Sequence, residues 1–440
     1  MILRISSIVV CFTLGFALSE LPAQDPVPRK LTIPECPEEG TENGRSTGIT
    51  LEQLQQLAMQ HNPTLAQARA ETWKAHGQYV QEGLKPNPGI YYTSSEIGNE
   101  GSAGQHGAYF SQEFVTGGKL YLSSQIYAMR QRGASWERMA QIYRVENNVR
   151  SEYYKIIVAR KLVCQALQIE RIAEDILNGI NERVAKGFSS NIDKYQATIE
   201  LQNARMLRLN AEAEYQAAWN RMRAVIGWDG LPMQSLADVE LVTPELEWEE
   251  TRDRLLSMSP QIQEAQFRVS SAMAKYNRAV AEPIPNVTVQ AGALYDYGTE
   301  DAIAQVQIGM PIPINNKNQG NIRTAHAEWI RACREVERLK LQLARDLAEE
   351  FKQYNASQAR LKLYDSDLIP AATKTLELSE QLVKGGEFNY LQLLTAQRTF
   401  TQTNIDRIKT EGTLWQSQIA IDGLLLTDGL QAPKESVAGD

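Results

Sequence analysis

The side chains that most often carry chemistry are few in this sequence, and they lie far apart. The chain has 440 residues and only four histidines: His61, His76, His106 and His326. No two of them have the one-turn spacing that would place two metal ligands on one face of a helix. The histidine spacing therefore predicts no metal site.

Other catalytic patterns are incomplete. Gly117-Gly118-Lys119 lacks the remainder of a phosphate-binding loop, and no Gly-x-Ser-x-Gly sequence for an activated serine occurs. Acidic pairs such as Glu349-Glu350 fit the exposed surface of a helix. We expect no enzyme, no catalytic residue and no cofactor.

The cysteines also lack a recognisable framework. Cys11 lies in an apolar leader and is a poor lipidation site, and Cys36, Cys164 and Cys333 have no paired spacing. Cys164 and Cys333 fall within helical patterns, where a free cysteine usually acts as a small buried apolar residue. The sequence predicts neither a disulfide framework nor a cysteine metal site.

Composition narrows the class of protein. The net charge is −8 without a basic stripe, which argues against nucleic acid as a partner.

Residues 1–23 are typical of a secretory signal peptide, with Arg4 before an apolar run, and an uncleaved anchor helix is the alternative. No later stretch is apolar for 18 residues, so any crossing of a membrane is expected to use strands. Residues 24–48 are expected to form an extended or disordered arm, and 428–440 a disordered tail.

Two short stretches interrupt long helical patterns. Residues 83–119 and 280–317 each open with a Pro-x-Pro sequence and continue as two runs of roughly 9 residues. The second stretch alternates apolar and polar residues with a period of two, which is typical of strands with one apolar face. The first stretch, with Ser94, Ser95 and Glu96, alternates less clearly. The helix-to-strand entries are Pro86, Pro88, Pro283 and Pro285.

The flanking helices occur twice. Pro63, Pro86 and Pro88 recur 197 residues later as Pro260, Pro283 and Pro285, and Lys186-Gly187 recurs 198 residues later as Lys384-Gly385. This spacing predicts an internal duplication, with repeat 1 at about 49–228 and repeat 2 at about 246–427 in one channel domain. Within repeat 1 we expect a helix near 51–84 interrupted at Pro63, a helix of about 68 residues at 119–186, and a third at 192–226.

The expected strand count constrains the assembly. Four strands cannot close a barrel, because an open edge in lipid leaves backbone groups without partners. Two chains would supply eight strands and a filled bore, whereas three would supply twelve and a lumen. A soluble hairpin capping a helical bundle is the alternative.

The duplication, the Pro-x-Pro entries and Gly187, Asp193 and Ala197 in a Gly-x5-Asp-x3-Ala pattern resemble the TolC-type outer-membrane factors. The resemblance covers residues 49–427. The Pro-Asn-Pro entry and the Leu-Leu-Thr-Ala-Gln-Arg stretch at 393–398 are most similar to the cobalt–zinc–cadmium (CzcC-type) branch.

This resemblance implies a mainly α fold with a small β part: a duplicated α-helical coiled-coil barrel and a 12-stranded outer-membrane barrel in a homotrimer. It also implies residues at a closed periplasmic tip that dock a periplasmic adaptor and an inner-membrane pump of the RND type. These residues are Lys186, Gly187, Asn191, Asp193, Lys384, Gly385, Asn389, Gln392 and Thr395. Many relatives carry aspartate where this chain has Gln392 and Thr395, so a single ring of Asp193 is expected. Asp193 is alternatively an N-cap of the following helix.

The expected function is a passive exit duct of a tripartite efflux system in the outer membrane, extending into the periplasm, with heavy-metal cations as expected cargo. Multidrug efflux and type I secretion remain alternatives. An exported helical scaffold without a pore is an alternative of a different class.

Overall fold

The computed structural model describes residue 36 and residues 48–101, 103–237, 243–385 and 390–434. The predicted signal peptide lies outside the described residues, as does most of the predicted N-terminal arm. The first half contains α1 (Leu51–His61), α2 (Pro63–Glu82), β1 (Gly89–Ser95), the short 3-10 helix η1 (Asn99–Gly101), β2 (Gln105–Phe114), α3 (Lys119–Ala185) and α4 (Asn191–Ile226). The second half contains α5 (Trp248–Met258), α6 (Pro260–Ala281), β3 (Val287–Asp296), β4 (Asp301–Gly309), α7 (Gln319–Leu363), the π-helical turn η2 (Tyr364–Leu368), α8 (Ile369–Gly385) and α9 (Tyr390–Asp422).

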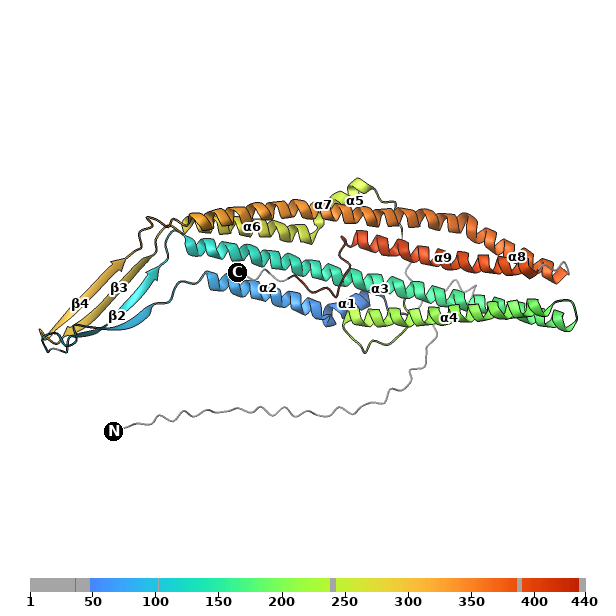
Figure 1. Ribbon diagram of the computed structural model, residues 1–440, viewed down its shortest axis with the longest axis horizontal. Coiled ribbons are helices and arrows are strands. Elements are labelled where there is room, and N and C mark those ends of the chain that lie inside the picture. The colour runs from blue at the N-terminus through green and yellow to red at the C-terminus, as the bar shows by residue number, and fades with distance from the viewer. Residues whose placement is uncertain (1–35, 37–47, 102, 238–242, 386–389, 435–440) are drawn as a thin grey trace, which may run out of the picture.

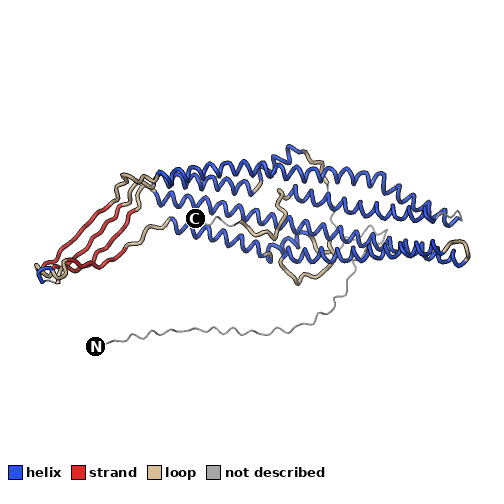
Figure 2. The backbone as a smooth tube through the Cα atoms, viewed as in Figure 1, coloured by secondary structure: helices blue, strands red, loops and turns tan. Residues whose placement is uncertain are grey.

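The molecule is elongated, with the strands at one end and the far ends of α3, α4, α8 and α9 at the other (Figures 1 and 2). The element order of the first half recurs in the second, as the proline and glycine spacing predicts. The 67-residue helix α3 has a length of about 100 Å at 1.5 Å per residue. It packs against α2 and α6 near the sheet, and against α4 and α9 farther away. One long helix therefore lies beside shorter helices stacked end to end.

Local sequence explains where these helices begin and end. Thr50 and Gln53 form the predicted capping box of α1, and Asn62 caps α2, whose first residue is Pro63. Gly227 ends α4 with a φ of 80°, a conformation that glycine adopts without steric cost. The interruption at Pro63 and the end at Gly227 are both confirmed.

All four strands join one antiparallel sheet in the order β1-β2-β3-β4. The two hairpins meet through β2 and β3, which pair from Gln105↔Asp296 to Phe114↔Val287. Within the described residues, β1 and β4 each pair along one side only. The first stretch does form a strand pair despite its weak alternation, and Glu96 lies just beyond β1.

The largest apolar core lies midway along the helices. It is formed by α1, α3, α4 and residues near Leu231 and Leu236, with Trp219 and Tyr153 fully buried. A second core joins α5, α6, α7 and α9 around Tyr354. The two tyrosines have matching roles, since the hydroxyl of Tyr153 donates to the carbonyl of Ala237 and that of Tyr354 to the carbonyl of Pro244. Each tyrosine therefore holds one end of the segment that links the two repeats.

Three predictions differ from the structure. Cys36 and Cys164 form a disulfide, although their spacing gave no sign of one. Residues 428–434 of the predicted disordered tail pack against α3, where Gln141 donates to the carbonyls of Gly429 and Gln431. The long helix of the second half is divided by the π-turn, so that α7, η2 and α8 have 45, 5 and 17 residues.

Candidate functional site

The first tip turn joins α3 to α4. Lys186 follows the last turn of α3, and Gly187 adopts a φ of 73°, which favours glycine. Asn191 is the first residue of α4. The turn exposes Phe188 to solvent, with 70% of its surface accessible.

Asp193 stabilises the start of α4, although not as its N-cap. The N-cap is Ser190, whose Oγ accepts from the Asp193 N–H at 3.2 Å, while Asp193 Oδ2 accepts from the Ser190 N–H at 2.9 Å. This reciprocal arrangement is a capping box, and it places a carboxylate at the positive end of a helix dipole. The prediction of a capping role is correct in kind, but Asp193 occupies the third helical position.

The second tip turn joins α8 to α9. Lys384 and Gly385 are the last residues of α8, and Asn389 lies outside the described residues. Gln392 and Thr395 lie in the first turns of α9 and are exposed. The predicted tip residues therefore gather at one end of the molecule from two separate helical hairpins, α3–α4 and α8–α9 (Figure 1).

The two hairpins are held together near the tip. Ile180 of α3, Ala197 of α4 and Leu394 of α9 form one apolar cluster, and α8 and α9 form another with Ile172 and Ile176 of α3 at its edge. Arg183 Nη1 donates to the carbonyl of Val383 at 3.2 Å, which links α3 directly to α8. Relative movement of the hairpins would have to break this contact.

The proline entries lie between helix and sheet at the opposite end. The carbonyl of Pro86 accepts from Gln112 Nε2 at 3.0 Å, and the carbonyl of Pro285 accepts from Thr116 Oγ1. Asn286 Nδ2 donates to Glu113 Oε1 at 2.7 Å. Pro88 directly precedes β1, and Pro283 lies between α6 and β3. Side chains of β2 and of the loop after it thus hydrogen-bond to both proline segments and orient the connections from α2 to β1 and from α6 to β3.

Two apolar seams remain uncovered on the tip helices. On α4, exposed residues recur with heptad spacing: Ile192, Tyr195, Ile199, Met206 and Leu209. On the η2–α8 segment, Leu368, Leu378 and Leu382 are exposed with the same spacing. The buried positions of α4, such as Ala197, Leu201 and Ala204, lie on its opposite face. α4 packs mainly against α3, and α8 mainly against α9, so the two exposed seams of one chain belong to different hairpins.

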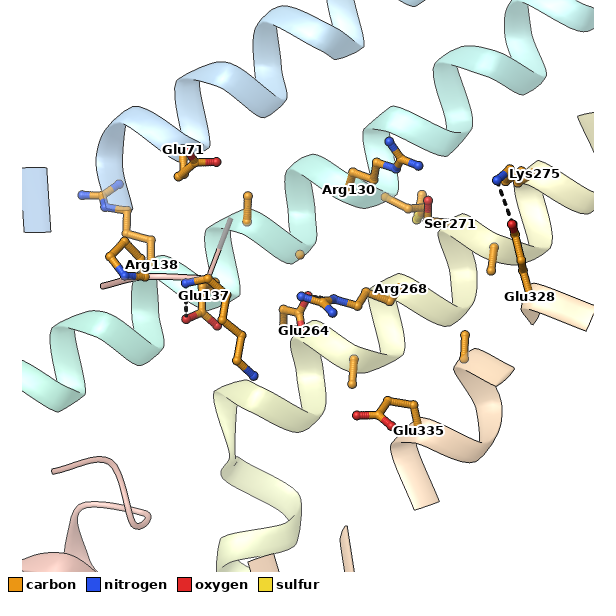
Figure 3. A pocket seen from close by; sticks show the side chains of 18 of the residues that line it. Glu71, Arg130, Glu137, Arg138, Glu264, Arg268, Ser271, Lys275, Glu328 and Glu335 are labelled. Carbon is orange, nitrogen blue, oxygen red and sulfur yellow. Dashed lines mark hydrogen bonds and ion pairs between the residues drawn. The ribbon is translucent and has the colours of Figure 1, made fainter. Parts of the chain in front are cut away.

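A charged groove of about 580 Å³ runs along α6 between α3 and α7 (Figure 3). Lys275 Nζ pairs with Glu328 at 2.8 Å, and Arg268 pairs with Glu264. Burial raises the pKa of Glu264, and the charge of Arg268 opposes this effect. The lining contains neither histidine nor cysteine, so it offers no nucleophile–base pair of the usual kind.

Two features are absent from the part of the chain that the structure describes. No helix there is long and apolar enough to cross a membrane. Across the same ranges, no three His, Cys, Asp or Glu side chains lie close enough together to hold a metal ion.

Comparison with known proteins gives consistent matches. A family model described as outer membrane efflux protein matches residues 54–228 and again 251–425, two stretches that begin 197 residues apart. The chain is 26% identical over 380 residues to the cobalt-zinc-cadmium resistance protein CzcC of Cupriavidus metallidurans, covering 86% of this chain and 90% of that protein.

Solved structures resemble the fold closely. A structure of CusC has a TM-score of 0.73 at 17% identity and covers 88% of this chain and 95% of its own. The outer-membrane channel OprN has a TM-score of 0.74 at 17% identity, covering 87% and 91%. VceC of Vibrio cholerae has a TM-score of 0.72 at 17% identity, covering 86% and 96%.

Proposed function

The chain belongs to the outer membrane efflux protein family, and from this premise we propose that it is the exit duct of a tripartite efflux system. The family consists of passive channels of the outer membrane that extend into the periplasm, and not of enzymes. The prediction of family, location and absence of catalysis is confirmed. One observation carries the finer proposal. At each end of the elongated molecule, two surfaces of the single chain are left uncovered: the outer sides of β1 and β4 in the sheet, and the apolar seams of α4 and η2–α8.

The sheet supplies the first pair of edges. Among the residues that the structure describes, β1 and β4 each have one side without a strand partner, and every position of β4 is exposed in the single chain. Three copies joined β4 to β1 would close a 12-stranded barrel and leave no backbone edge in lipid. Exposed aromatic side chains on the strands, including Tyr91, Tyr92 and Tyr295, suit the boundary between lipid and water.

The helices supply the second pair of edges. The seam of α4 on one copy would pack against the seam of η2–α8 on the next, in the manner of a coiled coil. Such a contact uses two different surfaces, so it forms a ring only if the rotation closes. In a homotrimer, one threefold rotation would pair β4 with β1 of the next copy and also pack the α4 seam against the η2–α8 seam of the next copy.

The transported material would pass through this duct without a fixed binding site, and a pump would supply the energy. The adaptor would dock at the tip formed by Lys186, Gly187, Asn191, Asp193, Lys384, Gly385, Asn389, Gln392 and Thr395, with an RND-type inner-membrane pump beyond it. Similarity to CzcC over most of the chain favours heavy-metal cations as cargo. Multidrug efflux or type I secretion is the alternative within the family, and a pore-free scaffold is the alternative outside it.

Planar-bilayer conductance of the purified protein, combined with its mass in mild detergent, tests the proposal. We expect a trimer that conducts. Ile199→Lys should weaken the trimer by placing a charge in the α4 seam, whereas Gln196→Lys, an exposed change away from the seam centre, should not. A monomer without conductance would refute the duct and favour the scaffold.

The Asp193 ring has its own test. Asp193→Ala removes both the carboxylate and the capping box, whereas Ser190→Ala removes the cap alone. We expect Asp193→Ala to raise conductance and weaken block by multivalent cations, and Ser190→Ala to do neither. An unchanged block in Asp193→Ala would leave only the capping role.

A further inference from the structure

Hydrogen bonds to α3 set the course of the chain after α9. The N–H of Gly429 donates to Asn148 Oδ1 at 3.2 Å, and the N–H of Lys434 donates to Glu137 Oε1 at 3.4 Å. As the residue number rises from 429 to 434, the contacted position on α3 therefore falls from 148 to 137. Because β2 precedes α3, the chain advances along α3 toward the sheet.

The charged groove along α6 begins where this part of the chain arrives. Pro433 and Lys434 both belong to its lining. Burial raises the pKa of Glu264, and the charges of Arg268 and Lys434 oppose that rise, so Lys434 lies near the first groove residue of α6. Figure 3 shows the groove residues Glu264, Arg268, Ser271 and Lys275 following one another along α6. This face of α6 is about 16 Å long at 1.5 Å per residue, and it leads toward β3 and the sheet.

Small residues leave room in the groove for an extended chain. Those contributed by α3, α6 and α7 are Gly133, Ala134, Ala265, Ala272 and Ala332. Three of them, Gly133, Ala134 and Ala265, are buried. The helices thus approach one another beneath the groove without large side chains to fill it.

The charges of the groove favour an acidic occupant. Each glutamate of the lining already has a cationic partner: Glu71 with Lys74, Glu137 with Arg144, Glu264 with Arg268, Glu328 with Lys275 and Glu335 with Arg338. Three lining arginines, Arg130, Arg138 and Arg331, form no ion pair with any described residue. Arg130 Nη1 is also buried without a hydrogen-bond partner in the part of the chain that the structure describes. A carboxylate that entered the groove would therefore meet positive charge that no described acidic group balances.

The chain itself supplies an acidic segment at the entrance of the groove. After Lys434 the sequence continues with Glu435-Ser436-Val437-Ala438-Gly439-Asp440. The segment has small side chains between two carboxylates, and six extended residues span at most about 20 Å, enough for the whole α6 face. Attachment to Lys434 would hold it near the groove at an effective concentration of about millimolar, so modest contacts are enough.

We propose that the charged groove binds segment 435–440 of the same chain, and that this contact holds α3 of the first repeat against α6 and α7 of the second. The arginines of the groove attract the carboxylates of Glu435 and Asp440, and the small residues accommodate the middle of the segment. The proposal concerns the helices next to the sheet and does not depend on the chain forming a duct.

Disulfide cross-linking of the full-length protein tests the position of the segment. Ala438 lies four residues beyond Lys434 and Ala272 eight residues beyond Glu264, so both fall about 12–13 Å along the groove. Ala438→Cys and Ala272→Cys are introduced together in a Cys333→Ser background, which removes the free cysteine of the described residues. The control replaces Ala272→Cys by Ser270→Cys, at an exposed position of α6 outside the groove. A disulfide needs Cα atoms within about 7 Å, so we expect at least about tenfold more cross-link at 272 than at 270 by mass spectrometry.

Charge reversal tests why the segment binds. Glu435→Lys with Asp440→Lys should lower the cross-link at 272 at least about threefold, because repulsion replaces attraction. Glu337→Lys with Glu349→Lys changes the net charge equally, at exposed sites outside the groove, and should leave the cross-link unchanged. Equal losses in the two double variants would overturn the proposal.

A chain that stops at Lys434 provides a measurement without added cysteines. Loss of the contact should raise hydrogen–deuterium exchange of amides 129–138 in α3 and 264–275 in α6 about two- to fivefold, with 201–211 of α4 unchanged. Equal cross-linking at 270 and 272, or no cross-link together with unchanged exchange in the shortened chain, would overturn the proposal. A protein that cross-links at 272 but never conducts would support the proposal and refute the duct.

Discussion

The long helix of the first repeat and its counterpart in the second have the same number of residues but are built differently. α3 is continuous, lacks proline, and is covered by α2, α6, α4 and α9 along its length. Its counterpart consists of α7, the π-turn and α8, contains Pro370, and buries far fewer residues over α7 and the π-turn. Only α3 carries a disulfide.

This contrast shows that two copies of one duplicated unit can differ in their resistance to bending. Buried apolar contacts and a covalent cross-link resist bending, whereas a proline and exposed ion pairs permit it. We therefore expect the long helix of the first repeat to resist bending more than its counterpart in the second.

A proline in the first repeat should have the largest effect. Ile172→Pro would remove a helical bond in α3 and disturb the tip cluster, at a cost of about 3 kcal/mol or more. We expect a lower melting temperature by circular dichroism and poor recovery of assembled protein. Pro370→Ala is the matched change in the second repeat and should be tolerated. If Ile172→Pro and Pro370→Ala were tolerated equally, the two long helices would not differ in their resistance to bending.

Loss of the disulfide should come next. Cys164→Ser frees a cross-link that spans 128 residues of sequence, and loss of such a link typically costs about 2–4 kcal/mol. The melting temperature should fall, and reducing agent should lower it in the wild type but not further in the variant. Cys333→Ser, which alters a free cysteine, is the control. Insensitivity of the wild type to reductant would show that the cross-link contributes no stability.

The paired tyrosines should behave alike in both repeats. Tyr153→Phe and Tyr354→Phe each remove one hydroxyl that donates to a backbone carbonyl, at a cost of about 1–2 kcal/mol each. Denaturant titration of each variant measures this cost. A much larger loss for Tyr153→Phe would mean that the first core holds the linker on its own.

The smallest expected effect concerns Glu146 of α3, a half-buried carboxylate. Burial raises the pKa of Glu146 above its ordinary value, so its ionised form costs stability above the raised pKa. That cost disappears as the pH falls through the raised pKa towards the ordinary value. Glu146→Gln should therefore raise the melting temperature by about a degree or two at pH 8, with no gain at pH 4. A gain that persists at pH 4 would contradict this account.

Much of the local structure follows from the sequence because its signals are local. The Pro-x-Pro entries, the capping residues Thr50 and Gln53, and Gly187 and Gly227 each act within one turn of their own position. The duplication is visible in the sequence because the same helix-ending prolines and glycines recur 197 or 198 residues later. Pro370 was an equally local signal, and its position inside a long helical pattern could have indicated the break before it.

The candidate tip was predictable in place but not in detail. The spacing located both turns and attached a capping function to Asp193, yet only the structure identified Ser190 as the cap. The disulfide was missed because Cys36 and Cys164 are 128 residues apart, and cysteine pairing at that distance is a matter of folding and not of spacing.

Sequence by itself determined the family, the mainly helical fold, the duplicated order of elements and the two strand pairs. Tertiary structure alone decided that β2 pairs with β3, that the tail after α9 packs on α3, and that one long helix is enclosed while the other is not. The physical reason is the sequence distance over which each interaction acts. Periodicity and caps depend on neighbours within a few residues, whereas these contacts join segments more than a hundred residues apart and form only where the apolar faces of both repeats are buried together.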